Sequence, residues 1–231
     1  MIVTDRFVFL HLHKSGGSFV NECLRHCVPG AREIGYHLPR RLIPEAFAQL
    51  PAIGLVRNPW SYYVSWYSFQ QQRPQPNALF RILSDGGRLD FNGTIHNMLD
   101  LGDNDAMLAQ LVDTLPRQYG SQGLNLPGFA LAPIRGSGLG FYSYLYEYLY
   151  AGTANTLRVG RMEKLPQELT ELLESTGQPV TDALREYLRS APPRNRSQHA
   201  PYGSYYNQAL RDRVAARDAL VIGQYGYRFE G

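Results

Sequence analysis

The feature that most constrains the fold of this chain is a short apolar run that ends in a glycine-rich loop and continues into helical spacing. Residues 7–12, Phe-Val-Phe-Leu-His-Leu, have the composition of a buried parallel strand. Residues 13–18, His-Lys-Ser-Gly-Gly-Ser, are turn formers and interrupt the run. Beyond them the apolar residues recur at helical spacing until Pro29-Gly30 ends the pattern: Phe19, Val20, Cys23, Leu24, Cys27 and Val28. The sequence therefore predicts a strand, a loop and a helix, in that order.

The same pattern occurs again from residue 52. Ala52–Val56 is apolar throughout and predicts a second buried strand. Asn58 is a typical N-cap, and Pro59 suits the first position of a helix. The helix that follows has one apolar face: Trp60, Tyr63, Val64 and Tyr67. Two strands, each followed by a helix, predict a three-layer α/β/α fold with a central parallel sheet.

The rest of the chain gives weaker signals. Helices are expected at 105–115, 141–150, 165–175, 181–188 and 206–224, and a third strand at 156–159. Residues 120–140 are rich in Gly and Pro and predict a long surface loop, and residues 191–204 predict another. Because no repeat or linker divides the chain, we expect a single domain over residues 1–231 with a variable helical and loop insertion at 71–140.

Composition excludes several classes of protein. The chain has 231 residues, of which 44% are hydrophobic and 19% charged, so it can form a core and is not disordered. A net charge of +3 excludes a strongly basic protein that coats nucleic acid. No apolar stretch is long enough to span a membrane, and the first apolar run is typical of a strand rather than a secretory signal. Two cysteines give no disulfide framework, so we expect a cytoplasmic protein.

The loop at residues 14–18 has the properties of an anion site. Glycines let a bound group approach the backbone, and the amides and dipole of a helix N-terminus favour negative charge. Lys14 adds a compact cation. A lysine is unusual in this chain, because only Lys14 and Lys164 among the 23 basic residues are lysines. Ser15 and Ser18 add hydroxyl donors. The alternative is an ordinary glycine turn. The loop also differs from the pattern G-x-x-x-x-G-K-[ST], because here the lysine precedes the glycines.

Two motifs together resemble the sulfotransferases that use 3′-phosphoadenosine 5′-phosphosulfate (PAPS). HLHKSGGSF is similar to the loop that binds the 5′-phosphosulfate, and LVRNPWSYYVSWY is similar to the motif that binds the 3′-phosphate. GYHLP places a histidine where carbohydrate-type members have one, and VGRMEKL and the last helix resemble the closing part of the family. The resemblance covers residues 1–70 and, in outline, 142–231, and it does not extend to residues 71–140. It implies a P-loop NTPase-like fold, with residues 71–140 forming the acceptor side or a lid.

The resemblance also implies site residues. Lys14, Ser15, Gly16, Gly17, Ser18 and Phe19 would hold the 5′-phosphosulfate. Arg57, at the end of the second strand, can bind the 3′-phosphate through two parallel hydrogen bonds, with Ser65 as a hydroxyl donor. Asn195, Arg196 and Ser197 would close on the nucleotide, or they form a solvated basic turn. The sulfuryl transfer requires no metal, and the product nucleotide would be 3′-phosphoadenosine 5′-phosphate (PAP).

The transfer needs a base for the acceptor hydroxyl and a positive charge on the leaving phosphate. His37 is the first candidate for the base, because an imidazole titrates near neutrality and the family has its histidine in this segment. Its alternative is a structural loop histidine. His13 and Glu33 are the next candidates for the base, while His11 on the strand is expected in the core. Lys14 would neutralise the leaving oxygen.

The expected function is transfer of a sulfuryl group from PAPS to a carbohydrate or other alkyl hydroxyl, on a small-molecule or glycan acceptor. A nucleotide kinase and a non-catalytic nucleotide-binding module remain as alternatives. A zinc site at Cys23, His26 and Cys27 would lack a fourth ligand. We expect neither nucleic acid nor a membrane as a partner.

Overall fold

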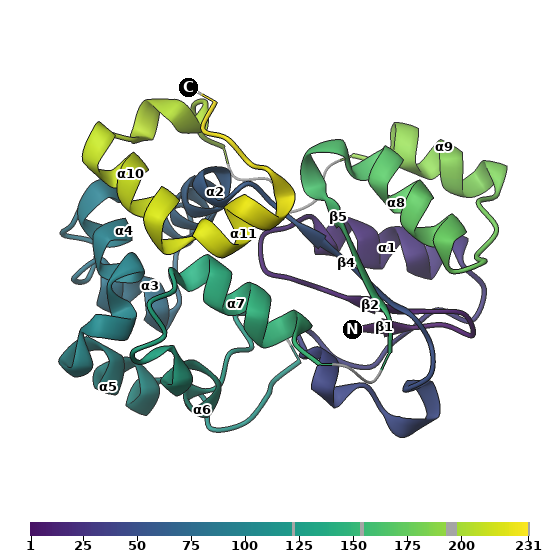
Figure 1. Ribbon diagram of the computed structural model, residues 1–231, viewed down its shortest axis with the longest axis horizontal. Coiled ribbons are helices and arrows are strands. Elements are labelled where there is room, and N and C mark those ends of the chain that lie inside the picture. The colour runs from purple at the N-terminus through teal and green to yellow at the C-terminus, as the bar shows by residue number, and fades with distance from the viewer. Residues whose placement is uncertain (122, 153–154, 193–197, 231) are drawn as a thin grey trace. The chain divides into compact units, whose positions relative to one another are not determined.

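The structure is a computed structural model that describes residues 1–121, 123–152, 155–192 and 198–230 (Figure 1). The chain forms two compact units. Unit 1 comprises Met1–Arg57, Gly120–Gly123 and Glu147–Asn195, and unit 2 comprises Asn58–Tyr119, Leu124–Tyr146 and Arg196–Gly231. Unit 1 contains the sheet, while unit 2 is helical. The expected insertion at 71–140 lies mostly in unit 2, which also contains α2 (Pro59–Gln71) and the last helices.

Unit 1 is built on a sheet of five strands in the order β3-β1-β2-β4-β5. These are β1 (Ile2–Val3), β2 (Val8–Leu10), β3 (Arg32–Glu33), β4 (Ala52–Val56) and β5 (Leu157–Arg161). β2, β4 and β5 are parallel, with Phe9 opposite Ile53 and Gly54 opposite Val159. β1 runs antiparallel to both β2 and β3. The α/β fold predicted from the sequence is therefore confirmed, and the sheet is mixed rather than wholly parallel.

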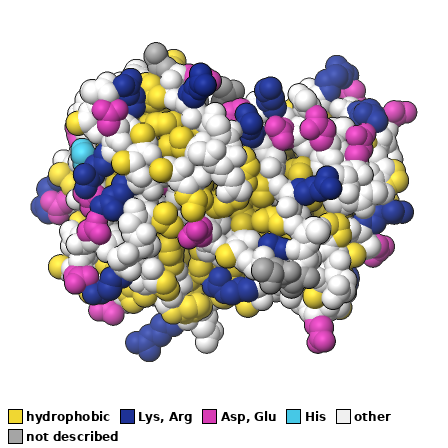
Figure 2. Space-filling view, in the orientation of Figure 1, with side chains coloured by type: hydrophobic (Ala, Val, Ile, Leu, Met, Phe, Trp, Pro, Cys, Tyr) yellow, Lys and Arg dark blue, Asp and Glu magenta, His cyan; other side chains and the backbone are white. Residues whose placement is uncertain are grey.

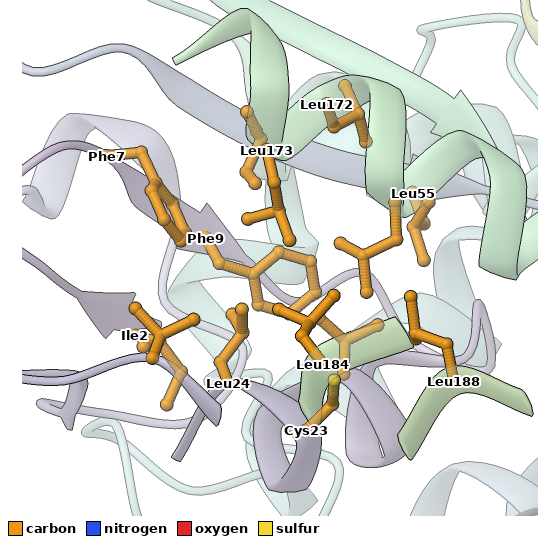
Figure 3. Close-up of a cluster of buried hydrophobic side chains, with 14 residues drawn as sticks. Ile2, Phe7, Phe9, Cys23, Leu24, Leu55, Leu172, Leu173, Leu184 and Leu188 are labelled. Atoms are coloured by element: carbon orange, nitrogen blue, oxygen red, sulfur yellow. The ribbon is translucent and has the colours of Figure 1, made fainter. Parts of the chain in front are cut away.

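One face of this sheet is covered by α1 (Gly17–Cys27), α8 (Leu165–Ser175) and α9 (Asp182–Ser190). Alternate residues of the strands, Phe9, Ile53 and Leu55, point into a shared core with the apolar faces of these helices. Figure 3 shows Leu24 of α1 and Leu184 of α9 converging on Phe9. This burial fixes the end of β2 against the start of α1, which is where the candidate loop lies.

On the opposite face of the sheet, the side chain of Tyr150 lies directly against the backbone of β4. Tyr150, in the last turn of α7 (Phe141–Tyr150), donates its hydroxyl to the carbonyl oxygen of Leu55 at 2.9 Å. Its ring lies against Gly54, where a Cβ would come within 2.4 Å of the hydroxyl oxygen. Arg40, in the short helix η1 (Arg40–Leu42), donates to the carbonyl oxygens of Tyr150, Gly152 and Asn155 and to the side chain of Asn155. These bonds fix the backbone of Tyr150 and Gly152 at the end of α7 and that of Asn155 just before β5.

The remaining helices lie in both units. In unit 1 these are η1, η2 (Glu45–Phe47) and η5 (Met162–Lys164). Unit 2 contains α2, α3 (Ala78–Leu83), α4 (Phe91–Leu99), η3 (Leu101–Asp103), α5 (Asp105–Thr114), α6 (Gly128–Leu131), η4 (Ala132–Ile134), η6 (Tyr202–Tyr205), α10 (Gln208–Arg217) and α11 (Ala219–Tyr225). Asn58 begins α2 as predicted, because its side-chain oxygen accepts from the backbone amides of Trp60 and Ser61.

Two predictions for unit 2 are wrong. The helix expected at 206–224 is two helices, α10 and α11, interrupted at Asp218. The buried Asp218 carboxylate accepts from the hydroxyl of Tyr63 at 2.7 Å and from the backbone amide of Ser143 at 2.8 Å, and burial raises its pKa to about 6. Residues 120–140 are not simply a surface loop, since α6 and η4 lie there and Leu131 and Ile134 are buried.

Candidate functional site

The loop predicted to bind an anion follows β2 directly and ends at the first turn of α1. Gly16 is the N-cap residue of α1 and has φ 80°, a left-handed conformation that glycine adopts without strain. The backbone amides of Phe19 and Val20 donate to the carbonyl oxygen of Gly16. Within the described residues no side chain caps this helix end, and its first turn contains no acidic residue. An uncapped helix N-terminus of this kind favours an anion.

Both glycines of the loop have a packing reason as well. A Cβ on Gly16 would lie 2.8 Å from Cδ1 of Leu165 and 3.3 Å from Cγ of Met162. A Cβ on Gly17 would lie only 1.8 Å from Cδ2 of His11. The imidazole of His11 therefore occupies the space in which a side chain at residue 17 would stand. The sequence predicts these glycines as room for a ligand or as an ordinary turn, and it does not indicate the contact with His11.

Gly17→Ala should destabilise the protein strongly, because the His11 ring is buried and has little room to move. Overpacking of a buried site lowers the free energy of unfolding by about 3 kcal/mol. For a chain of this size that corresponds to a melting temperature lower by roughly 6–12 °C in a thermal unfolding experiment. Gly223→Ala on α11, with nothing within 4 Å of its Cβ, is the matched control and should leave the melting temperature unchanged or slightly higher. The double variant Gly17→Ala/His11→Ala should be less destabilised than the sum of the two single changes, and strict additivity would contradict this packing.

Two cations stand together at the loop. Lys14 is half-buried, and the guanidinium Nη1 of Arg57 donates to the carbonyl oxygen of Lys14 at 3.2 Å. Burial, first, and then the positive charge of Arg57 together lower the pKa of Lys14 to about 7. Protonation of such a lysine is costly without a ligand, and a bound anion stabilises the protonated amine. Arg57, expected to bind the 3′-phosphate, thus lies beside the loop that is expected to hold the 5′-phosphosulfate.

The other loop residues take part in the fold of the loop itself. The hydroxyl of Ser15 is buried and donates to the carbonyl oxygen of His13 at 3.2 Å. The hydroxyl of Ser18 lies 3.3 Å from that of Tyr36. The ring of Phe19 packs against Tyr187 of α9, with centroids 5.7 Å apart. Of these side chains, the hydroxyl of Ser18 is the best placed to serve a ligand at the helix N-terminus, and roles for Ser15 and Phe19 in binding stay predictions.

His37 lies against this loop, although it is far from it in the sequence. Its ring stacks on that of His13, the residue before Lys14, with centroids 3.6 Å apart and planes 16° from parallel. The His11 ring is 4.3 Å away, and Nδ1 of His37 lies 2.7 Å from the carbonyl oxygen of His11. His37 is only 5% exposed. Burial, first, and then the charges of His13 and His11 hold its pKa well below the ordinary value of 6.5, so the ring is neutral at physiological pH.

The backbone at the site is strained. Lys14 and His37 both have left-handed backbone, with φ 54° and 51°. Apart from glycines, only Asp85 and Asn125 share a positive φ within the described residues. Such residues cost free energy and persist where the surrounding structure imposes them, often at functional sites. The two residues to which the sequence assigned the chemistry thus have a backbone conformation that no other non-glycine residue described in unit 1 adopts.

The remaining predicted site residues stay predictions. Ser65 lies buried on α2 and belongs to unit 2, whereas Arg57 belongs to unit 1. Asn195, Arg196 and Ser197 lie outside the described residues. Glu33, on the edge strand β3, is exposed. Sequence reasoning missed Tyr36, whose ring contacts both His11 and His37 edge-on, and the only signal for it was its place next to His37.

The described part of the chain has no group of three or more His, Cys, Asp or Glu residues placed to hold a metal ion. No helix in the described ranges combines the length and the apolar character needed to cross a membrane. On the face drawn in Figure 2, basic and acidic side chains are interspersed, in agreement with the net charge of +3.

Comparison with known proteins gave one kind of match. No family model matches the chain, and no curated protein matches it. Among solved structures, the chain is similar to that of the mouse sulfotransferase SULT7A1 complexed with PAP, at 13% sequence identity. The match covers 96% of this chain and 88% of that chain, with a TM-score of 0.49. A likeness at this level assigns no activity, so the function is inferred from the site.

Proposed function

We propose that the protein is a PAPS-dependent sulfotransferase that acts on a hydroxyl group. The observation that carries this proposal is the return of His37 to the loop, where it stacks on the residue next to Lys14. A neutral imidazole, a lysine and an uncapped helix N-terminus thus lie within one short stretch of structure. In-line sulfuryl transfer needs these three elements together: a base, a countercharge and an anion cradle.

The loop would hold the phosphosulfate end of PAPS. The amides at the start of α1 would bind its oxygens, and Lys14 would stand at the bridging oxygen. One N–H of the Arg57 guanidinium would stay on the carbonyl oxygen of Lys14. Its other N–H groups would bind the 3′-phosphate. Ser65 and residues 195–197 would complete the nucleotide site. The same elements suit a nucleotide kinase less well, since the loop lacks the pattern G-x-x-x-x-G-K-[ST].

The hydrogen bond at Nδ1 defines the role of His37. A neutral imidazole that donates from Nδ1 to the carbonyl oxygen of His11 has its lone pair on Nε2. In the proposed step, Nε2 takes the proton of the acceptor hydroxyl while the acceptor oxygen bonds to sulfur. The bond between sulfur and the phosphate oxygen breaks, and its electron pair stays on that oxygen, opposite Lys14. No metal ion is needed for this step.

The proposed acceptor is a small molecule or glycan that presents a carbohydrate or other alkyl hydroxyl. This choice rests on the resemblance of the GYHLP segment to carbohydrate-type sulfotransferases. Both cysteines are free thiols, which agrees with the cytoplasmic location that we propose.

Binding of PAP tests the proposal against its alternatives. PAP should raise the melting temperature, because a ligand at 100 times its dissociation constant stabilises the native protein by about 2.7 kcal/mol. ATP with Mg²⁺ should raise it much less, since ATP lacks the 3′-phosphate. Release of PAP from PAPS in the presence of a panel of hydroxylated acceptors then separates an enzyme from a binding module. Stabilisation by ATP with Mg²⁺ and none by PAP would replace this proposal with a kinase.

The variant Arg57→Lys is the control for the nucleotide assignment. Lysine keeps the charge and loses the two parallel hydrogen bonds of the guanidinium. PAP affinity should fall about tenfold, whereas binding of adenosine 5′-phosphosulfate, which lacks the 3′-phosphate, should change little. An equal loss for both ligands would show instead that Arg57 acts by supporting the carbonyl of Lys14.

A further inference from the structure

The stacked pair of His13 and His37 has a geometry that neither the anion loop nor the base requires. The two rings are nearly parallel and 3.6 Å apart, and both side chains are buried. His13 directly precedes Lys14 in the chain and its ring contacts His37, so it adjoins both residues proposed for the chemistry. An imidazole held at one nitrogen alone can still turn about its Cβ–Cγ bond within the limits of that hydrogen bond. A flat ring against its face removes that freedom.

Three side chains surround the ring of His37. His13 covers one face, His11 is tilted at 52° against it, and the ring of Tyr36 meets it at 64°. The charged and titratable groups that act on His37 are His13, His11 and the amino group of Met1, and the phenol ring of Tyr36 contacts it as well. Two imidazolium ions cannot occupy parallel planes at this distance in a buried site without strong repulsion. The stack therefore also disfavours the protonated form of His37.

We propose that His13 is a positioning residue for His37: its ring fixes the plane in which Nε2 of His37 faces the acceptor hydroxyl. This inference rests on the proposed function, because it gives His13 a part in the same reaction. It assigns His13 no contact with the substrate. It also separates the roles of two histidines that the sequence offered as competing bases.

Two substitutions of His13 distinguish the roles of its ring. His13→Phe keeps a flat ring over His37 and removes the titratable group, whereas His13→Ala removes the ring. We expect His13→Ala to lower kcat about tenfold, since misplacement of a catalytic group can cost up to ~10²-fold, with KM for PAPS within twofold of wild type. His13→Phe should keep most of kcat. In both variants the low-pH limb of kcat should move to higher pH, because a like charge beside His37 is gone.

Nuclear magnetic resonance of the histidine ring protons gives a second measurement that needs no turnover. The titration of the His37 signal should move to higher pH in His13→Phe, and the signal of the exposed His26 should stay in place. If His13→Phe loses turnover as completely as a variant of His37 itself, His13 is the base and the proposal fails. If His13→Ala keeps full kcat and an unchanged titration of His37, the proposal fails too. Absence of PAP binding and of turnover in the wild-type protein would refute the sulfotransferase function, while the titrations would still decide whether the two rings are coupled.

Discussion

Replacing Lys14 by alanine should lower turnover by ~10²–10³-fold, the usual cost of removing one group that stabilises a developing anion. The affinity for PAP should fall much less. The reason is that negative charge on the bridging oxygen grows as the bond to sulfur breaks, so Lys14 interacts more strongly with the transition state than with bound nucleotide. Steady-state kinetics with PAPS and calorimetry with PAP measure the two quantities separately.

The lowered pKa of Lys14 gives this prediction a second readout. In the unliganded protein, burial and the nearby Arg57 hold this pKa at about 7. A bound phosphate raises it, because an opposite charge favours the protonated amine. Above pH 7 the protein must therefore take up a proton when PAP binds, and the affinity for PAP should fall as the pH rises through 7 and beyond. Calorimetry at pH 8 in buffers of different ionisation enthalpy should detect uptake that approaches one proton in wild type and is lost in Lys14→Ala.

The variant Lys164→Ala is the control for Lys14→Ala. Lys164 is the only other lysine of the chain, and it is exposed at the end of η5. Lys164→Ala should leave turnover and proton uptake unchanged. Selective labelling of lysine yields just two side-chain signals, so the titration of Lys14 can be followed directly against that of Lys164. Equal losses of PAP affinity and turnover in Lys14→Ala would make Lys14 a ground-state anchor only.

The elements with strong local signals could be predicted closely. The strand at Ala52–Val56 and the helices at Phe141–Tyr150 and Leu165–Ser175 have the bounds that their apolar patterns predict. β1 and β3 could not be predicted, since each has two residues and no period can be read from two residues. The break between α10 and α11 also escaped prediction. It depends on the buried Asp218, whose partners Tyr63 and Ser143 are distant in the sequence.

The candidate site was predictable to a similar degree. A lysine and two glycines at a strand-to-helix junction indicate an anion loop from local chemistry alone, and the structure places them at an uncapped helix end. The packing of His11 against Gly17 and the stack of His13 on His37 are tertiary contacts. No spacing in the sequence encodes them. The sequence treated His13 and His37 as alternatives, whereas the structure puts them in contact.

Replacing His37 by asparagine should lower turnover by ~10²–10⁴-fold, the range for loss of a general base. Asparagine tests the role of the base more specifically than alanine does, for two reasons. It tolerates the left-handed backbone that residue 37 adopts, at φ 51°. Its side-chain amide can also donate to the carbonyl oxygen of His11 in place of Nδ1. The variant should therefore fold and bind PAP like wild type while lacking a nitrogen lone pair for the hydroxyl proton.

The pH dependence of turnover follows from the environment of His37. The sequence alone suggested an ionisation near neutrality. Burial and the neighbouring histidines hold the pKa of His37 well below 6.5, so turnover should rise with pH through that lowered value and stay level at neutral pH. The unfolded chain binds this proton at higher pH than the folded protein does, so stability falls as the pH drops below about 6.5. Circular dichroism at each pH is needed to separate loss of the base form from unfolding.

His26→Ala is the matched control, because His26 is exposed on α1, where its Nδ1 lies 2.8 Å from the backbone carbonyl oxygen of Glu22 and its ring stacks on Tyr187. It should leave both turnover and the low-pH limb unchanged. The buried position of His37 also suits a purely structural histidine, and the asparagine variant separates the two roles. A structural role predicts a lower melting temperature with nearly normal turnover, whereas the base predicts a normal melting temperature, normal PAP binding and lost turnover. Near-normal turnover in His37→Asn would exclude His37 as the base and direct the search to His13 and then to Glu33.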